Sequence, residues 1–276
     1  MISGRYTIGE LIGEGSFGKV YVGESLRSGT KVAIKADEVH GEKTTLAHEA
    51  KIMNYLRGPE YIPVLRYYGV DDESRTAYLV MNLLGKSLED VKRDGGPLKP
   101  GLAITIGLQC IRILRYMHSK SIIHRDVKPD NFLFGLGDRT LSVIDFGLSK
   151  KYVDSAGKHM ARKEDKSVVG TVRYVSARVQ RGVEASRRDD IVSLGYMLVY
   201  LQTDKLPWQG VRKPPLLRDR EIRRVKEQTS SSTLCMGLDD CFAHLLLHGK
   251  SLAFDEEPAY ARLEARFADA RRARAF

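Results

Sequence analysis

The sequence predicts an α+β protein with a β-rich N-terminal lobe, residues 1–84, and an α-rich C-terminal lobe, residues 85–276. Three observations support this fold class. Alternating apolar and polar residues punctuated by glycine dominate the first third of the chain. Beyond Gly85 the apolar residues recur at helical spacing. Finally, 276 residues are enough for two lobes that share an interface.

In the N-terminal lobe, "YTIGELIG", "KVYVGESL" and "TKVAIKAD" read as strands, and "YLVM" (78–81) as a further buried strand. A helix is predicted at roughly 43–57. Glu49 falls on the apolar face of that helix, with Leu46 and Met53 at three- and four-residue spacing. A carboxylate on such a face costs free energy unless it is paired. The sequence therefore predicts a cationic partner for Glu49.

In the C-terminal lobe, Pro100 opens a helix at the position where proline is best tolerated. Short strand-like pieces, "NFLF" and "LSVIDF", follow a loop at 124–131. Residues 191–201 are apolar nearly all round, which predicts a helix buried in the centre of this lobe.

The composition bears on where in the cell the protein is expected and on the roles of its cysteines. No apolar run approaches the ~20 residues that cross a bilayer, and the N-terminus lacks the apolar stretch of a secretory signal. We therefore expect a cytoplasmic or nuclear protein that does not enter membranes. The three cysteines form no pair at zinc-ligand spacing and are odd in number, which argues against a zinc knuckle or a disulfide framework.

The net charge of +10 is concentrated in two stretches. Residues 150–178 hold eight Lys/Arg and three Asp/Glu, and residues 205–226 hold eight Lys/Arg and two Asp/Glu. A solvated surface is the ordinary explanation for such charge. An anionic protein substrate or a nucleic acid is the functional alternative.

A glycine-rich stretch, "GEGSFGKVYVG", begins at Gly13 and is weak evidence by itself, since many hairpins carry such turns. Four further elements follow it in fixed order: "VAIK" with Lys35, the helix with Glu49, "HRDVKPDN" and "DFG". Together, in this order and on these predicted elements, they match the protein-kinase set. The glycine-rich stretch is therefore interpreted as a nucleotide clamp.

The residue types suit phosphoryl transfer, in which positioning and charge neutralisation do most of the work. The glycines let the backbone close over phosphates, Lys35 supplies a charge for the α- and β-phosphates, and Glu49 would hold that ammonium. Asp126 would accept the proton of the substrate hydroxyl, beside Lys128. Asn131 and Asp145 are hard oxygen ligands for Mg²⁺. The expected cofactors are thus ATP and Mg²⁺.

Longer segments narrow the resemblance. "LLGKSLED", "YMHSKSIIHRDVKPDNFLFGLG", "IDFGLSKKY", "SRRDDIVSLGYMLVYLQTDKLPWQG" and "SLAFDEEPAY" resemble the casein kinase 1 family of Ser/Thr protein kinases. The resemblance runs from about Arg5 to the last predicted helix. Lys128 and Thr171 also resemble the Ser/Thr kinases more than the tyrosine kinases. The resemblance implies the bilobal protein-kinase fold and an ATP-dependent serine/threonine kinase.

In that family the substrate is serine or threonine preceded by a phosphorylated residue or an acidic cluster. The partners implied here are therefore acidic or phosphorylated proteins. Arg173 matches the anion-site arginine of the family, and Arg218 is the best match for its second basic partner. Lys150 and Lys166 match a second basic site beside the activation segment.

The resemblance also implies a nucleotide site. Met81 would lie at the back of the adenine pocket, Asn82 to Leu84 would form the hinge, and the Leu84 backbone would bond to adenine. Asp190 resembles the buried aspartate that anchors the catalytic-loop backbone, and His124 is assigned a packing role. The glycine-rich loop and the apolar walls would contribute Ile12, Gly13, Gly15, Ser16, Gly18, Val20, Ala33 and Leu133.

Two positions depart from the pattern. Ser176-Ala177-Arg178 stands where most kinases have Ala-Pro-Glu and where this family has Ser-Ile-Asn, so Arg178 adds an unexpected positive charge near the substrate groove. Asn82 replaces a hinge glutamate usual in the family. Neither change removes a catalytic group.

Two alternatives stay open at this point. A catalytically inactive scaffold with the same fold would bind partners only, although such proteins generally lack one of the five groups present here. A nucleic-acid platform would use the basic surface, but no motif and no interleaved aromatic residues support specific nucleic-acid binding. We expect a monomer.

Overall fold

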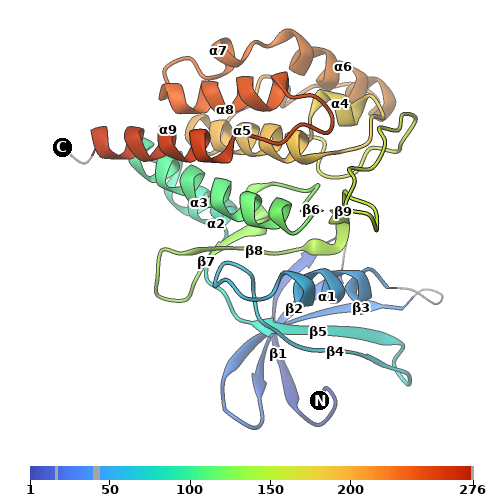
Figure 1. Ribbon diagram of the computed structural model, residues 1–276. Coiled ribbons are helices and arrows are strands. Elements are labelled where there is room, and N and C mark those ends of the chain that lie inside the picture. The colour runs from blue at the N-terminus through green and yellow to red at the C-terminus, as the bar shows by residue number, and fades with distance from the viewer. Residues whose placement is uncertain (16–17, 40–43, 275–276) are drawn as a thin grey trace. The chain divides into compact units, whose positions relative to one another are not determined.

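The computed structural model describes residues 1–15, 18–39 and 44–274 of the chain (Figure 1). The chain divides into two compact units. The N-terminal unit comprises Met1–Gly85 and Leu133–Gly147, and the C-terminal unit comprises Lys86–Phe132 and Leu148–Phe276. The two strand-like pieces predicted after the loop at 124–131 thus belong mostly to the N-terminal unit, although the sequence placed them in the C-terminal lobe.

The N-terminal unit contains a five-stranded antiparallel sheet in the order β1-β2-β3-β5-β4. β-branched and aromatic residues favour these strands. The four predicted strands are confirmed, with these bounds: β1 Tyr6–Gly15, β2 Gly18–Ser25, β3 Lys31–Glu38 and β5 Thr76–Asn82. The sheet also contains β4, Leu65–Asp71, which the sequence pattern did not indicate.

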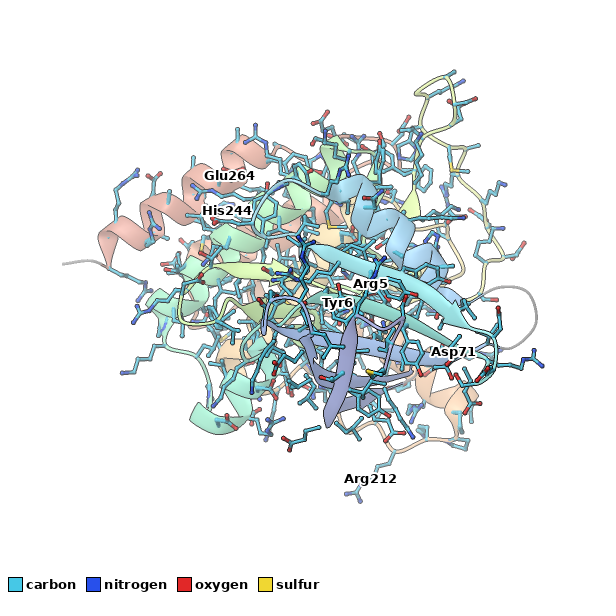
Figure 2. The ribbon with its side chains drawn as sticks, turned by 90° about the horizontal axis from the view of Figure 1, so that it is seen from below. Arg5, Tyr6, Asp71, Arg212, His244 and Glu264 are labelled. Carbon is cyan, nitrogen blue, oxygen red and sulfur yellow. The ribbon has the colours of Figure 1, made fainter. Side chains whose placement is uncertain are left out.

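The strand register gives this sheet two distinct faces. Val20 pairs with Lys35, and Ala33 with Met81, so these side chains share one face because paired residues point to the same side. The other face holds a cluster of buried residues, Ile2, Tyr6, Val32, Ile34 and Val80, with Tyr6 labelled in Figure 2. The glycine-rich loop and Lys35 are therefore placed by the same register that builds this cluster.

Helix α1 (Thr45–Leu56) lies in the N-terminal unit and packs on β4 and β5. Thr44 caps it by accepting a hydrogen bond from the Leu46 amide (3.0 Å). The helix lies within the predicted range, and Lys43 falls outside the described residues. The short strands β7 (Phe132–Phe134) and β8 (Leu141–Val143) pair with each other, and the Val143 amide donates to the Tyr61 carbonyl (3.0 Å).

The C-terminal unit is mainly helical (Figure 1). Helix α3 packs against α5 and α9, and α5 packs against α8. Strand β6 (Ile122–Ile123), which ends immediately before the loop at 124–131, pairs with β9 (Lys150–Lys151). The helices are α2 Leu88–Gly95, α3 Pro100–Ser119, α4 Ala177–Gln180, α5 Arg187–Thr203, α6 Pro215–Gln228, α7 Ser231–Leu234, α8 Asp240–Ser251 and α9 Tyr260–Ala273.

Helix α5 is the buried centre of this unit, as its apolar sequence predicts. Residues 188–201 are all buried. Its N-terminus is closed by a capping box in which the Ser186 amide donates to the Asp189 carboxylate (2.9 Å). None of the helices in the described ranges is both long and apolar enough to cross a bilayer.

Candidate active site

Three predicted residues meet in the N-terminal unit. The Lys35 ammonium donates to the Glu49 carboxylate (2.8 Å) and to Asp145 Oδ1 (3.0 Å). Strand β3 supplies the lysine, α1 the glutamate, and the segment after β8 the aspartate. The partner expected for a carboxylate on the apolar face of α1 is therefore present.

Burial and charge act in opposite directions on Lys35, which is 7% exposed. Burial alone would lower its pKa, but the Glu49 and Asp145 carboxylates outweigh this and raise the pKa above its usual value. Lys35 is thus a fixed cation at neutral pH. This is the state in which it can attract phosphate oxygens.

Asp145 has a backbone φ of 64°, in the left-handed region that non-glycine residues seldom adopt. Such strain persists only where surrounding contacts maintain it, and it clusters at functional sites. One carboxylate oxygen of Asp145 bonds to Lys35, and carboxylate oxygens are ligands that Mg²⁺ accepts. The residue is therefore suited to bridge a cation and a lysine.

The predicted adenine-site residues of the N-terminal unit lie along one sheet face and one short strand. Val20, Ala33 and Met81 share the face of Lys35. The Gly85 amide donates to the Phe134 carbonyl (2.8 Å), which places the chain after Leu84 beside β7 and Leu133. Ile12 is half exposed. Val20, Ala33 and Met81 therefore give the Lys35 face an apolar surface.

The structure gives Asn82 a hydrogen-bond partner and shows why Gly18 must be glycine. The Asn82 side chain accepts a hydrogen bond from the Val64 amide (2.7 Å) and so has a local structural partner. Gly18 has a φ of 102°, and a Cβ there would clash with the Ala36 carbonyl oxygen, so only glycine fits. Ser16 lies outside the described residues, and Gly13 and Gly15 end β1.

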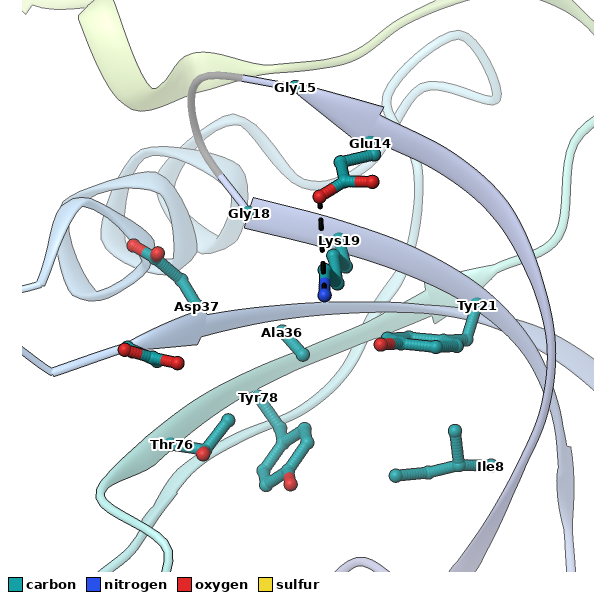
Figure 3. Close-up of a pocket in the computed structure, with 11 residues that line it drawn as sticks. Ile8, Glu14, Gly15, Gly18, Lys19, Tyr21, Ala36, Asp37, Thr76 and Tyr78 are labelled. Atoms are coloured by element: carbon teal, nitrogen blue, oxygen red, sulfur yellow. Dashed lines mark ion pairs between the residues drawn. The ribbon is translucent and has the colours of Figure 1, made fainter.

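A cavity of about 530 Å³ lies on the opposite side of the same sheet (Figure 3). Tyr21, Ala36 and Tyr78 line it, and the Glu14–Lys19 ion pair (4.0 Å) crosses its edge. Strand alternation puts Tyr21 and Ala36 on the face away from Lys35. Gly15 and Gly18 of the glycine-rich stretch also line this cavity, whereas Val20, Ala33 and Met81 lie on the other face of the sheet, with Lys35.

The other predicted catalytic residues come together in the C-terminal unit around Asp126, which is 4% exposed. Its Oδ1 accepts hydrogen bonds from the Thr171 amide (2.9 Å) and hydroxyl (2.7 Å). Its Oδ2 lies 2.7 Å from Lys128 Nζ. The side-chain nitrogen of Asn131, Nδ2, donates to the Asp126 backbone carbonyl (2.9 Å). This leaves the side-chain oxygen of Asn131 as a ligand for a hard cation.

Asp126 stays ionised at neutral pH. Burial alone would raise its pKa, but the charge and hydrogen bond of Lys128 and the hydroxyl of Thr171 outweigh burial and lower the pKa. An ionised carboxylate is an acceptor only, so it can take a proton from a hydroxyl brought within hydrogen-bond reach.

Asp190, on α5, anchors the backbone of the loop at 124–131. It accepts hydrogen bonds from the amides of His124 (2.7 Å) and Arg125 (2.9 Å), and it bonds to His118 Nε2 (2.9 Å). These partners outweigh complete burial and keep the pKa of Asp190 below its usual value. Its location agrees with the anchoring role that the resemblance implies, and His118 is an additional partner that sequence reasoning missed.

His124 and Arg125, the first two residues of the loop, have different environments. His124 is fully buried, and its Nδ1 accepts from the Asp126 amide (3.2 Å), in agreement with a packing role. Arg125 has a φ of 70° and donates to the Leu148 carbonyl (2.6 Å). Each unit thus has one residue of left-handed backbone conformation beside its predicted catalytic residues, Asp145 in the N-terminal unit and Arg125 in the C-terminal unit.

Lys150 and Lys166 line a common cavity of about 310 Å³, together with Arg125. Lys150 bonds to Glu184 (3.0 Å), whereas Lys166 is exposed. The two lysines were predicted to form one basic site, and the fold brings them together. Arg125 was missed, although its position between His124 and Asp126 in the motif was a usable signal.

The segment 172–175 is held through its carbonyl groups. Trp208 Nε1 donates to the Arg173 carbonyl (2.8 Å). Lys226 Nζ donates to the carbonyls of Val172 (2.6 Å) and Val175 (2.7 Å). Sequence reasoning missed this role of Lys226, because its partners are more than fifty residues away and belong to the backbone.

The Arg173 guanidinium is exposed and lies 5.3 Å from the centre of the Tyr200 ring. Stacking on an aromatic face orients it at low cost. Arg218 is on α6, half exposed, with Asp219 3.8 Å away. These two arginines therefore belong to separate elements, each with its own neighbours.

The chain was compared with known protein families. Residues 6–238 match the protein kinase domain family. The match spans the sheet of the N-terminal unit and continues through α7, and it includes every predicted catalytic residue. The fold class agrees with it, because the N-terminal unit contains a five-stranded antiparallel sheet and the C-terminal unit is helical.

Proposed function

Because the chain belongs to the protein kinase family, we propose that it is an active serine/threonine kinase of the casein kinase 1 type. It would transfer the γ-phosphoryl group of ATP to acidic or phosphate-primed protein substrates. The observation that carries this proposal is the bonded group of Asp126, Lys128 and Thr171. Lysine and threonine at these positions are the residues that resemble the Ser/Thr kinases.

The substrate hydroxyl would give its proton to Asp126, whose lowered pKa keeps it ionised. Lys128, 2.7 Å from the same carboxylate, would neutralise charge that develops on the transferred group. Thr171 fixes the carboxylate through two hydrogen bonds, so the base is already oriented. General-base catalysis of this kind contributes typically ~10²–10⁴-fold.

The cofactor side of the proposal rests on the donor set. ATP with Mg²⁺ supplies the phosphoryl group and most of the charge neutralisation. Lys35, fixed by Glu49, would bind phosphate oxygens, and the oxygens of Asn131 and Asp145 would hold Mg²⁺. The face with Val20, Ala33 and Met81 would contact the adenine ring.

The basic residues support a preference for anionic substrates. Arg173 is exposed and oriented by Tyr200, and Lys150, Lys166 and Arg125 line one cavity. A phosphate bound by such groups gains charge-assisted hydrogen bonds of roughly 1.5–3 kcal/mol each, less at high salt. Arg218 remains the proposed second partner of Arg173.

The experiment compares two peptides, one with phosphoserine three residues before the acceptor serine and one with alanine there. We expect faster phosphorylation of the primed peptide, and Arg173→Ala should weaken the preference. Equal rates for both peptides would reject the priming proposal and keep a kinase without it. Transfer to tyrosine in place of serine would reject the Ser/Thr assignment.

The inactive-scaffold alternative gives a different outcome, since such a protein would turn over no ATP with Mg²⁺ and either peptide.

We also propose a cytoplasmic or nuclear monomer whose activity does not require phosphorylation of residues 150–171. Phosphatase treatment that abolishes activity would contradict the last point.

A further inference from the structure

A second basic cavity lies in the C-terminal unit, apart from the residues assigned above to substrate anions. Its volume is about 200 Å³, several times the ~30 Å³ that a water molecule occupies in the liquid. Arg181 and Glu227 are exposed at its edge, so it opens to solvent. Residues from α4, α5, α6 and α8 line it, among them Arg178, Arg181, Tyr196, Lys226, Glu227 and Lys250.

Arg178, the residue that departs from the kinase pattern, turns inward at this cavity. Its guanidinium donates to the carbonyls of Gly249 (3.3 Å) and Lys250 near the end of α8. These bonds give Arg178 a structural role at the end of α8 that the sequence did not indicate. With five N–H groups and two such bonds, the guanidinium keeps donors for a further acceptor.

Lys226 and Lys250 are also bonded to carbonyl groups. Lys226, 1% exposed, donates to Val172 and Val175, and Lys250 Nζ donates to the Thr229 carbonyl (3.1 Å). Carbonyl dipoles satisfy hydrogen bonds but supply no net negative charge. Three half-buried or buried cations thus line one cavity without a carboxylate bonded to any of them among the described residues.

No nearby carboxylate bonds to these cations among the described residues. Asp189 acts on Arg178 only at longer range, and its oxygens already accept hydrogen bonds from Ser176 and the Ser186 amide. Glu227 bonds to Arg181 (2.9 Å) and lies 3.9 Å from Arg223, so its charge is already shared. Asp219, the carboxylate that acts on Lys226, lies two helical turns away on α6, with Arg218 3.8 Å from it. Charges removed from water without a counter-ion are unfavourable, and a bound anion removes that penalty.

We propose that this cavity binds a tetrahedral oxyanion, a phosphoryl or sulfate group, between Arg178, Lys226 and Lys250. Arginine favours this ligand because its planar fork matches two oxygens at once, and the lysines add point charges. The source is free inorganic phosphate or the phosphoryl group of a phosphorylated peptide. The proposal does not depend on catalysis, because binding is measured without turnover.

Occupancy of the cavity would act on the segment 171–175. An anion beside Lys226 favours its charged form, which strengthens the bonds to Val172 and Val175. Thr171 of this segment bonds to Asp126. Phosphate should therefore stabilise the segment that orients the base.

The test is a titration of the purified protein with sulfate, and separately with inorganic phosphate, by calorimetry and thermal unfolding at constant ionic strength set with chloride. We expect saturable binding and a rise in Tm. Arg178→Asn and Lys250→Met should each weaken the affinity at least about tenfold. Arg224→Ala is the matched control on exposed α6, since Arg224 pairs with Glu221 (2.6 Å), and should change nothing.

Two further comparisons make the result specific. Lys166→Ala removes a residue of the other basic site, and the Arg178-dependent binding must survive it. A phosphoserine peptide that competes with sulfate identifies a protein ligand, and competition by free phosphate alone identifies the small ion. Affinity unchanged by both Arg178→Asn and Lys250→Met, or an equal effect of chloride, would overturn the proposal.

Wild-type protein gives an independent check that needs no variant. Sulfate keeps its charge across neutral pH, whereas burial lowers the pKa of Lys226 to about 7 and also lowers that of Lys250. Sulfate affinity should therefore fall as pH rises through about 7, and a flat profile would contradict the role of Lys226. The charged and titratable groups that face it are Arg178, Arg181, Tyr196, Asp219, Glu227 and Lys250.

Discussion

Lys35 and Lys226 are both buried lysines, one in each unit, yet their surroundings are opposite. Lys35 bonds to two carboxylates, and its pKa is raised. Lys226 bonds to two backbone carbonyls, and burial lowers its pKa to about 7. The contrast shows that the partner, more than the degree of burial, decides whether a buried lysine remains a permanent cation.

The two lysines accordingly suit different tasks. A permanent cation can bind phosphate oxygens at any physiological pH. A lysine that titrates near neutral pH can hold a backbone segment with a strength that depends on pH or on a nearby anion. Four predictions test this difference, in order of decreasing effect.

The largest effect is expected for Lys35→Met. Loss of one fixed charge that stabilises a transition state typically costs ~10²–10³-fold in turnover. The variant also leaves Glu49 buried without its partner, which destabilises the fold by ~3–5 kcal/mol. Steady-state kinetics with ATP and circular dichroism measure both. The control is Lys31→Met, at an exposed position of the same strand. If Lys35→Met turned over substrate at the wild-type rate, the assignment of Lys35 to the active site would be wrong.

The second effect is on stability against pH. Between about pH 7 and 10.5, unfolded Lys226 is protonated while folded Lys226 is not. The unfolded state then binds more protons, so stability should rise with pH, by at most about 1.4 kcal/mol per pH unit. The free energy of unfolding of wild type minus that of Lys226→Met isolates this slope.

Lys35 provides the contrast in the same experiment. Its raised pKa means that its stabilising contribution is fully present below the unfolded value of 10.5 and is lost only as pH rises through the folded pKa. The contribution of Lys35 should therefore be constant from pH 7 to 9. A slope at Lys35, or none at Lys226, would reverse the comparison.

A third prediction concerns the end of the segment that Lys226 holds. Thr171→Ala keeps the amide bond to Asp126 but removes the hydroxyl bond of 2.7 Å. One such bond is worth about 1 kcal/mol, so turnover of a serine peptide should fall about five- to tenfold. Thr171→Ser retains the hydroxyl and should restore the rate, and failure to do so would assign the loss to packing.

The smallest effect is expected for Lys226→Met at pH 7. Two carbonyls lose their donor, which costs ~1–3 kcal/mol, but a charge with no carboxylate partner also disappears from the interior. The net change in unfolding free energy should be about 1 kcal/mol or less, far below that of Lys35→Met. Urea unfolding of both variants compares them directly, and equal losses would show that the two lysines are energetically alike.

The same contrast explains what the sequence could and could not predict. Glu49 was assigned a cationic partner because a carboxylate on an apolar helix face needs one, and local periodicity reveals that face. Asp190 was recognised by resemblance. The bonds of Lys226 and the inward turn of Arg178 depend on carbonyl groups brought close by the fold, and no side-chain pattern encodes a carbonyl. His118 was missed for a related reason, since its bond to Asp190 arises only from long-range packing, whereas Arg125 lies inside the motif and could have been included.

The most direct test of the proposed kinase activity is phosphate transfer from ATP with Mg²⁺ to a primed serine peptide by wild type and by Asp126→Asn. Asp126 is the residue on which Lys128, Thr171 and Asn131 converge. We predict phosphoserine formation by wild type and a ~10²–10⁴-fold lower rate for the variant, with ATP affinity largely kept. Equal rates for the two proteins, or no transfer by wild type, would contradict the proposal.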